Sequence, residues 1–380
     1  MPEPANHPHT GLKVVELARI LAGPWAGQIF ADLGAEVIKV ESPEGDDTRQ
    51  WGPPFVTYAD GTSDAAYFHA ANRGKRSVVI DFRTPAGQAE VRRLVAEADV
   101  VIENFKVGAL AKYGLDYASL SALNPSLVYC SITGFGQDGP YAARPGYDFI
   151  IQGMSGIMDL TGEPDGPPQK VGVAFADVMT GLYAVIAVQA ALAARTRTGQ
   201  GEHIDMALYD VMTGVLANQA QNYLTSGQCP RRLGNAHPNI TPYAVFPSSD
   251  GWFILAVGND GQFRRFCEAL GLAALASDAR FLTNSTRVEH RATLAVLIAE
   301  ATRLRSRDAL LALLESVGVP AGPINTVEDA FNDPQIIARG MQLEFAAPDG
   351  QLIKGVRTPI RFKQLELNLG LAAPQLGAGL

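Results

Sequence analysis

Residues 12–41, LKVVELARILAGPWAGQIFADLGAEVIKVE, contain the clearest signal of the fold class. Residues 12–17 are mostly apolar, as expected of a buried strand, and Val37, Ile38 and Val40 indicate a second strand over 36–41. Between them, Gly23-Pro24 precedes a segment with helical apolar spacing that extends from Trp25 to Leu33 and stops at Gly34. A strand, a helix and a second strand within about 30 residues predict a βαβ unit with parallel strands.

The same alternation continues along the chain. Strands are expected at 77–81, 100–103 and 127–132, with a helix over 85–98. Strands that alternate with helices predict an α/β fold with a parallel, doubly wound, Rossmann-like sheet. The turn after the first strand lacks the GxGxxG motif that binds dinucleotide phosphates, so neither NAD nor FAD is implied.

The second half differs in its pattern. Residues 149–224 are expected to be mostly helical, and 226–242 are rich in Gly, Pro, Arg and Asn, which is typical of a linker or active-site loop. Segments 243–246 and 252–257 predict a β-hairpin. Helical stretches follow at 262–270 and 287–317. A smaller α+β domain is therefore expected here.

Composition excludes several classes of protein. Of the 380 residues, 47% are hydrophobic and only 18% are charged, which indicates a globular chain of more than one domain. The formal charge of −8, without a long basic run, argues against nucleic acid as a partner. The three cysteines lie far apart and the histidines show no HExxH spacing, so no metal is expected.

The sequence also predicts a location. Residues 1–10 are polar and contain prolines, unlike a signal peptide or a basic transit segment. About 18 uninterrupted apolar residues, the length of a membrane span, occur nowhere. We expect a soluble, cytoplasmic protein with no membrane partner.

Asp177 is the most informative single residue. It is the lone carboxylate in VGVAFADVMTG, residues 171–181. The run before it is typical of a buried strand or the end of one, and an almost uncharged helical stretch, 178–195, follows. Asp is a favoured N-cap, so Asp177 is expected to begin that helix. The helix N-terminus favours the ionised form while apolar neighbours remove water, the state that a carboxylate nucleophile requires. Local pattern alone favours the other interpretation, a carboxylate that only caps the helix.

A series of short segments then follows a family pattern from about residue 11 to beyond 340. They include 11–17, 22–24, 32–41, 72–77, 103–105, 133–140, 146–148, 176–177 and 198–201. Together they resemble the class III CoA-transferase family, which includes formyl-CoA transferases, carnitine CoA-transferases and α-methylacyl-CoA racemases.

The resemblance implies an architecture. The expected assembly is a homodimer of two interlocked, ring-like chains. The large domain would combine residues 1–225 with a C-terminal return at 331–380, and the small domain with its linker would occupy 226–330. Coenzyme A, carried as an acyl-CoA co-substrate, is the implied cofactor.

The resemblance also implies a role for Asp177, which falls on the catalytic carboxylate of the family and is therefore favoured as the nucleophile. It would attack the thioester of an acyl-CoA, and the reaction would pass through an aspartyl anhydride and an aspartyl-CoA thioester. The backbone amides just after Asp177 are candidate donors to the oxyanions that form.

Positions that hold CoA in the family carry polar or basic residues here. These are Lys75, Arg76, Asn104 and Lys112, with Lys39 and Lys106 nearby. For any one of these lysines, a solvated surface charge is an equally good interpretation.

Four differences bear on which branch of the family the chain resembles. The racemase His is replaced by Tyr147 in Gly146-Tyr147-Asp148, and a tyrosine is a poor proton shuttle near neutral pH. Tyr147 and Asp148 are instead expected to line the acyl or CoA site, although simple packing would also explain Tyr147. Formyl-CoA:oxalate transferases carry Gln and Lys at the positions of Leu21 and Pro145, and their tetraglycine loop falls on the shorter 233–239.

The second half is more similar to the succinyl-CoA-dependent dicarboxylate branch, which includes glutarate CoA-transferases, over 232–237, 257–263 and 319–325. A dicarboxylate needs a cation for its distal carboxylate, and Arg binds carboxylates in bidentate geometry. His237 is a further candidate donor to an acyl carboxylate, or a loop histidine without a role. The candidate arginines are Arg19, Arg49, Arg73 and Arg144.

The leading hypothesis is transfer of CoA from succinyl-CoA, or a similar donor, to a small dicarboxylic acid. The alternatives are an acyl-CoA racemase or epimerase and a non-catalytic CoA-binding protein.

Overall fold

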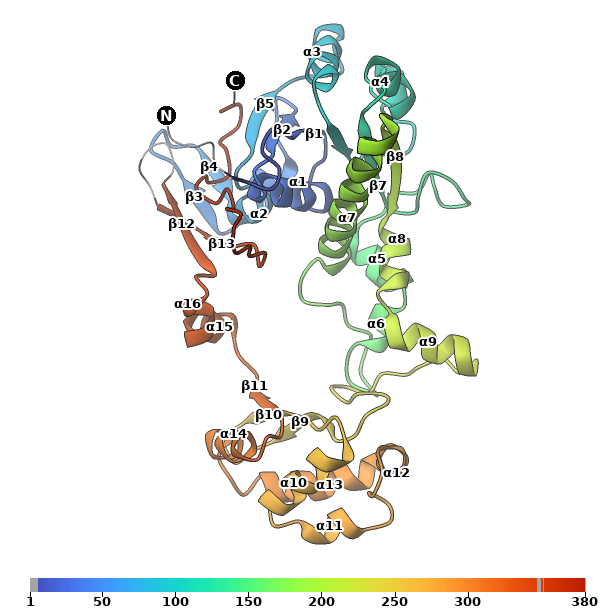
Figure 1. Cartoon of the computed structure of the whole chain (residues 1–380), viewed down its shortest axis with the longest axis vertical. Coiled ribbons are helices and arrows are strands. Elements are labelled where there is room, and N and C mark those ends of the chain that lie inside the picture. Colours follow the sequence, from blue (N-terminus) through green and yellow to red (C-terminus); the bar gives the residue numbers. More distant parts are fainter. Residues whose placement is uncertain (1–5, 347–349, 351, 380) are drawn as a thin grey trace. The chain divides into compact units, whose positions relative to one another are not determined.

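The computed structural model describes residues 6–346, 350 and 352–379, and the chain forms two compact units (Figure 1). Unit 1 comprises Met1–Ile157, Lys170–Gln228 and Pro334–Leu380, and unit 2 comprises Met158–Gln169 and Cys229–Asp333. The expected domain limits at 225/226 and 330/331 lie within a few residues of this division. The short segment 158–169, which the sequence had placed in the large domain, belongs to unit 2. Of the N-terminal segment 1–10, residues 1–5 lie outside the described part.

Unit 1 is built on a six-stranded, all-parallel sheet in the order β5-β2-β1-β6-β7-β8. The predicted α/β fold with a parallel sheet is therefore confirmed. One edge strand, β8, was missed, because the polar residues Glu202, His203 and Asp205 hide its pattern. The strands are β1 (Lys13–Glu16), β2 (Glu36–Glu41), β5 (Arg76–Val79), β6 (Val100–Glu103), β7 (Val128–Thr133) and β8 (Glu202–Ala207).

Helices cover both faces of this sheet because its central strands are apolar on both sides. Val14 packs in one core cluster with residues of α1 (Ala22–Asp32) and α7 (Phe175–Thr198). Its neighbour Val15 packs in a second cluster with α3 (Pro85–Ala96) and α4 (Tyr117–Leu123). Figure 1 shows α1 and α7 side by side, in agreement with their extensive contacts.

Smaller elements complete unit 1, and the C-terminal segment packs against its N-terminal part. Arg73 Nη1 donates to Val356 O at 2.8 Å, and the amide of Gly74 donates to Ala372 O at 3.2 Å. The elements are η1 (Asp47–Gln50), β3 (Phe55–Thr57), β4 (Ser63–Ala65), α2 (Ala66–Ala71), η2 (Ala111–Tyr113), α5 (Asp148–Met154), α8 (Leu208–Gly214), α9 (Ala217–Ser226), α16 (Pro334–Ala338), β12 (Gln342–Ala346) and β13 (Leu352–Val356), with α6 (Ile157–Leu160) at the division between the units.

Unit 2 combines a three-stranded antiparallel sheet, β11-β10-β9, with helices around a phenylalanine-rich core. The predicted hairpin is present, and the predicted helical stretch 287–317 is divided among three helices. The elements are β9 (Tyr243–Pro247), β10 (Trp252–Ala256), α10 (Asp260–Ala269), α11 (Ala273–Ser277), α12 (Asn284–Glu289), α13 (Arg291–Thr302), α14 (Arg307–Ser316), β11 (Ala321–Pro323) and α15 (Val327–Asn332).

Helix α7 is long and apolar enough to cross a membrane, and it is the one such helix in the described part of the chain. The sequence predicted no membrane span, because the criterion applied to it was an uninterrupted run of about 18 apolar residues. Composition of this kind is also typical of a core helix, and α7 packs on α1 and on the sheet. The helix is therefore weak evidence for a membrane span.

Candidate active site

A cavity of about 370 Å³ lies at the carboxyl ends of the central strands, within unit 1. Its walls include Arg19–Ala22 after β1, Asn104–Val107 after β6, and Thr133–Gly134 at the end of β7. The sheet order reverses between β1 and β6, and doubly wound sheets bind their ligands at this switch point. Asp177 and Asp148 face the same cavity, as does Tyr147, whose side chain is largely exposed.

Asp177 lies in the first turn of α7 but does not begin it. The helix starts at Phe175, and its N-cap is Ala174, which makes no side-chain capping bond. The predicted N-cap role of Asp177 is therefore wrong, and so is the strand expected over 171–176. The physical reason is that another side chain supplies the cap.

That side chain is Asp148, the first residue of α5. Its Oδ1 accepts hydrogen bonds from the amides of Ala176 and Asp177, at 2.7 and 3.3 Å. Its Oδ2 accepts from Gln152 Nε2 at 2.8 Å, and Gln152 Oε1 accepts from the amide of Val171 at 2.9 Å. Asp148 thus fixes the turn that carries Asp177 and the segment that leads into it.

The loop that delivers Asp148 is held close to the sheet by two glycines. A Cβ atom on Gly134 would lie 2.4 Å from Gly146 Cα, so no larger residue fits where these backbones meet. Tyr147 and Asp148 follow directly after this contact. The sequence had identified both residues but not the reason for their placement.

The electrostatics of the cavity make Asp177 unusual. Burial, and then the negative charge of Asp148, raise the pKa of Asp177 to about 7. Among the residues that the structure describes, none donates a hydrogen bond to its carboxylate. Asp177 is therefore a weakly solvated carboxylate that titrates near neutral pH, which suits a nucleophile.

The amide immediately after Asp177 is already engaged. Val178 N donates to Ala174 O at 3.1 Å as part of the helix. The prediction that the amides just after Asp177 receive an oxyanion is therefore wrong for Val178, because the helix begins earlier than expected.

The four candidate arginines divide into two groups. Arg49 pairs with Glu41 and Asp64, and Arg73 pairs with Asp32, all as buried ion pairs. Arg19 and Arg144 line the cavity instead. Arg19 Nη1 lies 3.0 Å from Asp47 Oδ2, whereas the Arg144 guanidinium lies 3.9 Å from the ring centroid of Tyr141. Lys106 adds a third cation to the cavity wall.

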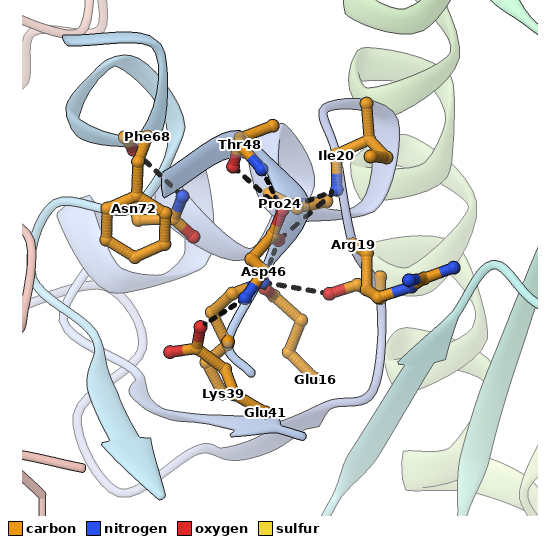
Figure 2. A network of polar contacts seen from close by, with 12 residues as sticks. Glu16, Arg19, Ile20, Pro24, Lys39, Glu41, Asp46, Thr48, Phe68 and Asn72 are labelled. Carbon is orange, nitrogen blue, oxygen red and sulfur yellow. Dashed lines mark hydrogen bonds and ion pairs between the residues drawn. The ribbon is translucent and has the colours of Figure 1, made fainter. Parts of the chain in front are cut away.

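Lys39 and Lys75 have no exposed side-chain surface. Lys39 Nζ lies 3.0 Å from Glu16 and 2.9 Å from Asp46, and Lys75 Nζ lies 2.8 Å from Glu16 (Figure 2 shows the Lys39 cluster). Burial, only partly offset by Glu16, lowers the pKa of Lys75 to about 8. Direct contact with CoA would require this cluster to open, so the structure does not support the CoA role that the sequence predicted for either lysine.

Asn104 faces the cavity and is tied to the turn after β1. It accepts a bond from Arg19 N at 2.9 Å and donates to Arg19 O at 2.7 Å. Both polar atoms of the Asn104 side-chain amide therefore bind the backbone of Arg19.

The remaining predicted residues do not line this cavity. Arg76 Nη1 lies 2.6 Å from Glu36 beside a smaller cavity of about 190 Å³, and Lys112 Nζ lies 4.7 Å from the ring centroid of Tyr113. His237 belongs to unit 2, where its Nδ1 accepts from the amide of Asn239 at 3.0 Å. The sequence analysis did not identify Asp46, Asp47 or Gln152. Of these, only Asp46 and Asp47 could have been noticed, because the run Asp46-Asp47-Thr48 is typical of a capped turn.

Comparison with known proteins shows which family the chain belongs to. The chain is 61% identical over 372 residues to the succinate–glutarate CoA-transferase of Agrobacterium fabrum, covering 97% of this chain and 93% of that protein. It is 38% identical to the human succinyl-CoA:glutarate CoA-transferase, over 97% of this chain and 84% of that protein. A crystal structure of a CAIB/BAIF family protein from Brucella suis superposes with a TM-score of 0.88 at 65% identity, covering 98% of this chain and 97% of the other. The pattern that defines CoA-transferase family III matches residues 10–379, and the chain is a member of that enzyme family.

Proposed function

We propose that this enzyme transfers CoA from succinyl-CoA to a small dicarboxylic acid such as glutarate, with Asp177 as the nucleophile. The observation that carries the proposal is the Asp177 carboxylate, which faces the switch-point cavity with a raised pKa and no bound donor among the described residues. The names of the similar proteins from Agrobacterium fabrum and human supply the substrate class.

The proposed reaction has four steps. The Asp177 carboxylate attacks the succinyl thioester carbonyl, which forms a mixed anhydride and expels CoA thiolate. The thiolate attacks the aspartyl carbonyl, so succinate leaves and an aspartyl-CoA thioester forms. The acceptor carboxylate attacks that thioester, which forms a second anhydride and expels the thiolate again. The thiolate then attacks the acceptor carbonyl, giving the new acyl-CoA and free Asp177. Exclusion of water protects both activated intermediates from hydrolysis.

Arg144 is our candidate for the distal carboxylate of the acceptor. It lines the cavity and, in the part of the chain that the structure describes, stacks on Tyr141 without an acidic partner. Arg19 is less suitable because Asp47 already neutralises it. An arginine that is held on an aromatic face and keeps its donors available is well prepared for a bidentate contact.

CoA itself would meet the exposed cations of unit 1. Lys106 at the cavity wall and Lys112 on η2 are exposed and follow the same strand, β6. Arg76 remains a candidate, although it already contacts Glu36 and Gly379 O. His237 also remains a candidate contact to the acyl group. No described histidine lines the cavity of unit 1, which disfavours a racemase.

We further propose that the enzyme is a cytoplasmic homodimer. Large apolar side chains are exposed along α5 and α7, and a single chain leaves them in water. Ile186 of α7 is 62% exposed. In a protein that is not in a membrane, an exposed apolar surface of this kind is expected to contact a partner protein. We propose that this partner is a second copy of the chain, as the interlocked dimer of the family implies. The exposed side chains are Phe149, Ile150, Met154, Leu182, Tyr183 and Ile186.

The deciding experiment is one incubation in deuterated water with succinyl-CoA and a panel of small carboxylic acids, followed by mass spectrometry of the CoA esters. The proposal predicts a new dicarboxylyl-CoA without deuterium at the α-carbon, and its loss in Asp177→Asn. Deuterium at the α-carbon of an added branched acyl-CoA, without transfer, would favour a racemase instead. CoA binding without either reaction would indicate a non-catalytic protein.

A further inference from the structure

Ile20, in the turn between β1 and α1, has a backbone conformation that its side chain disfavours. Its φ is 71°, in the left-handed region, where branched residues are rare because Cβ crowds the backbone. Ile20 lines the cavity between Arg19 and Leu21, and Leu21 is the N-cap of α1. A strained residue at this position requires something that holds it in place.

Asp46 holds Ile20 in place through a hydrogen bond to its backbone amide. Its two carboxylate oxygens lie 3.3 and 3.2 Å from Ile20 N and accept its hydrogen bond. The carboxylate is fixed in turn by Thr48, whose amide and hydroxyl donate to Oδ1 at 3.0 and 2.8 Å. The amide of Asp46 donates to Glu41 Oε2 at 2.8 Å. Figure 2 shows Asp46 between Ile20, Thr48 and Lys39.

A buried ion pair between Lys39 and Asp46 supports the contact of Asp46 with Ile20 N. Lys39 Nζ lies 2.9 Å from Asp46 Oδ2 and donates to Ala18 O at 2.9 Å. Burial alone would raise the pKa of Asp46, but the Lys39 ammonium and the Thr48 donors hold it below its usual range. Asp46 therefore stays ionised and keeps its acceptor strength.

The backbone from residue 18 to residue 24 is held at four places by side chains. Lys39 Nζ donates to Ala18 O, and Asp46 accepts from Ile20 N. The side chain of Asn104 accepts from Arg19 N and donates to Arg19 O. Lys75 Nζ donates to Pro24 O at 2.8 Å. Buried ion pairs contribute little net stability compared with apolar packing, so such a cluster is better explained by placement of the turn than by stability.

We infer that Asp46, supported by Lys39, is a positioning residue for the transfer reaction: it holds Ile20 in the left-handed conformation and thereby fixes the Arg19–Leu21 wall of the Asp177 cavity. The inference rests on the proposed function for its catalytic consequence. Misplacement of a cavity wall by about 1 Å can lower turnover about a hundredfold.

The test combines Asp46→Ala with Ile20→Gly. Glycine adopts positive φ without penalty, so the turn should depend less on Asp46 when residue 20 is glycine. In the wild-type background, Asp46→Ala should lower kcat/KM for CoA transfer about tenfold or more, and in the Ile20→Gly background the same change should cost clearly less. Asp46→Asn, which keeps an acceptor for Ile20 N, should fall between wild type and Asp46→Ala.

Two further measurements separate placement from stability. Hydrogen exchange at the Ile20 amide should accelerate in Asp46→Ala but not in the control Asp64→Asn, which alters another buried, ion-paired carboxylate outside the turn. If Asp46→Ala does not fold, Asp46→Asn is compared in both backgrounds by the same two measurements. Equal losses of kcat/KM in both backgrounds, or unchanged exchange at Ile20, would overturn the inference. If wild type transfers no CoA, the proposed function fails, while the exchange data still decide whether Asp46 holds Ile20.

Discussion

The carboxylate of Asp148 accepts a hydrogen bond from the backbone amide of Asp177, with 3.3 Å between the oxygen and the nitrogen. This one contact has two effects. It caps the helix that carries Asp177, which fixes the position of that residue, and it places a negative charge beside the Asp177 carboxylate, which contributes to its raised pKa. The group that positions the proposed nucleophile therefore also tunes its ionisation.

Asp148→Asn should separate these two effects. The amide keeps an acceptor for the helix but removes the charge, so the pKa of Asp177 should fall. Since the proposed mechanism requires ionised Asp177, kcat/KM in wild type should decrease as the pH drops below about 7, and in the variant this decrease should occur at lower pH. A pH profile of transfer checks this. Asp138→Asn, an exposed carboxylate in the same unit, should leave the profile unchanged.

Asp177→Asn should make the folded protein more stable at alkaline pH. The pKa of Asp177 is raised in the folded state, from an ordinary value of 3.8 to about 7, so the folded state holds the proton more tightly than the unfolded chain. The free energy of unfolding should therefore decline as the pH rises between these values, and stay low above them. Removing the charge relieves this penalty, and each kcal/mol relieved corresponds to roughly 2 °C in Tm. Thermal melts at about pH 8 test this, and a lower Tm for the variant than for wild type would count against a half-buried Asp177 carboxylate without a hydrogen-bond donor.

Arg144→Ala should impair the acceptor step selectively. Loss of a charge-assisted contact to the distal carboxylate should raise KM for a dicarboxylic acceptor about tenfold or more. The KM for a monocarboxylic acceptor of similar length should change little, because it has no group for Arg144 to bind. Arg144→Lys should restore only part of the dicarboxylate affinity, since lysine lacks the bidentate fork. An equal rise in KM for both classes of acceptor would remove Arg144 from the proposed role.

Ile186→Glu should dissociate the proposed homodimer. The side chain projects from α7 with most of its surface exposed, and a carboxylate buried in an apolar interface is costly. Sedimentation velocity should show a monomer for this variant and a dimer for wild type. Leu123→Glu on α4, also an exposed apolar side chain of unit 1, should remain dimeric. A wild-type monomer at micromolar concentration would contradict the dimer directly.

The strands of the central sheet were the most predictable part of the fold. The limits of β2 and β6 agree with the strands expected at 36–41 and 100–103. In β6 all four residues are buried, and its continuous apolar run, Val100–Ile102, is typical of a strand that is covered on both faces. The position of Asp177 in its helix was not predictable, because its cap comes from Asp148, which lies 29 residues earlier in the chain.

The buried charges were misinterpreted for a related reason. Lys39 alone in the sequence is equally consistent with a ligand contact or a solvated side chain. Only the register of the sheet, which pairs Glu16 directly with Lys39, reveals a buried ion pair. The left-handed conformation of Ile20 has no sequence signal at all, because isoleucine disfavours it and long-range contacts impose it.

The proposed covalent bond between Asp177 and CoA can be trapped. The protein is incubated with succinyl-CoA without an acceptor, quenched and digested, and the peptide that contains Asp177 is examined by mass spectrometry. Covalent catalysis by Asp177 predicts a CoA adduct on this residue that hydroxylamine converts to a hydroxamate, and no adduct in Asp177→Asn. An adduct on another residue, or full transfer by Asp177→Asn, would contradict it.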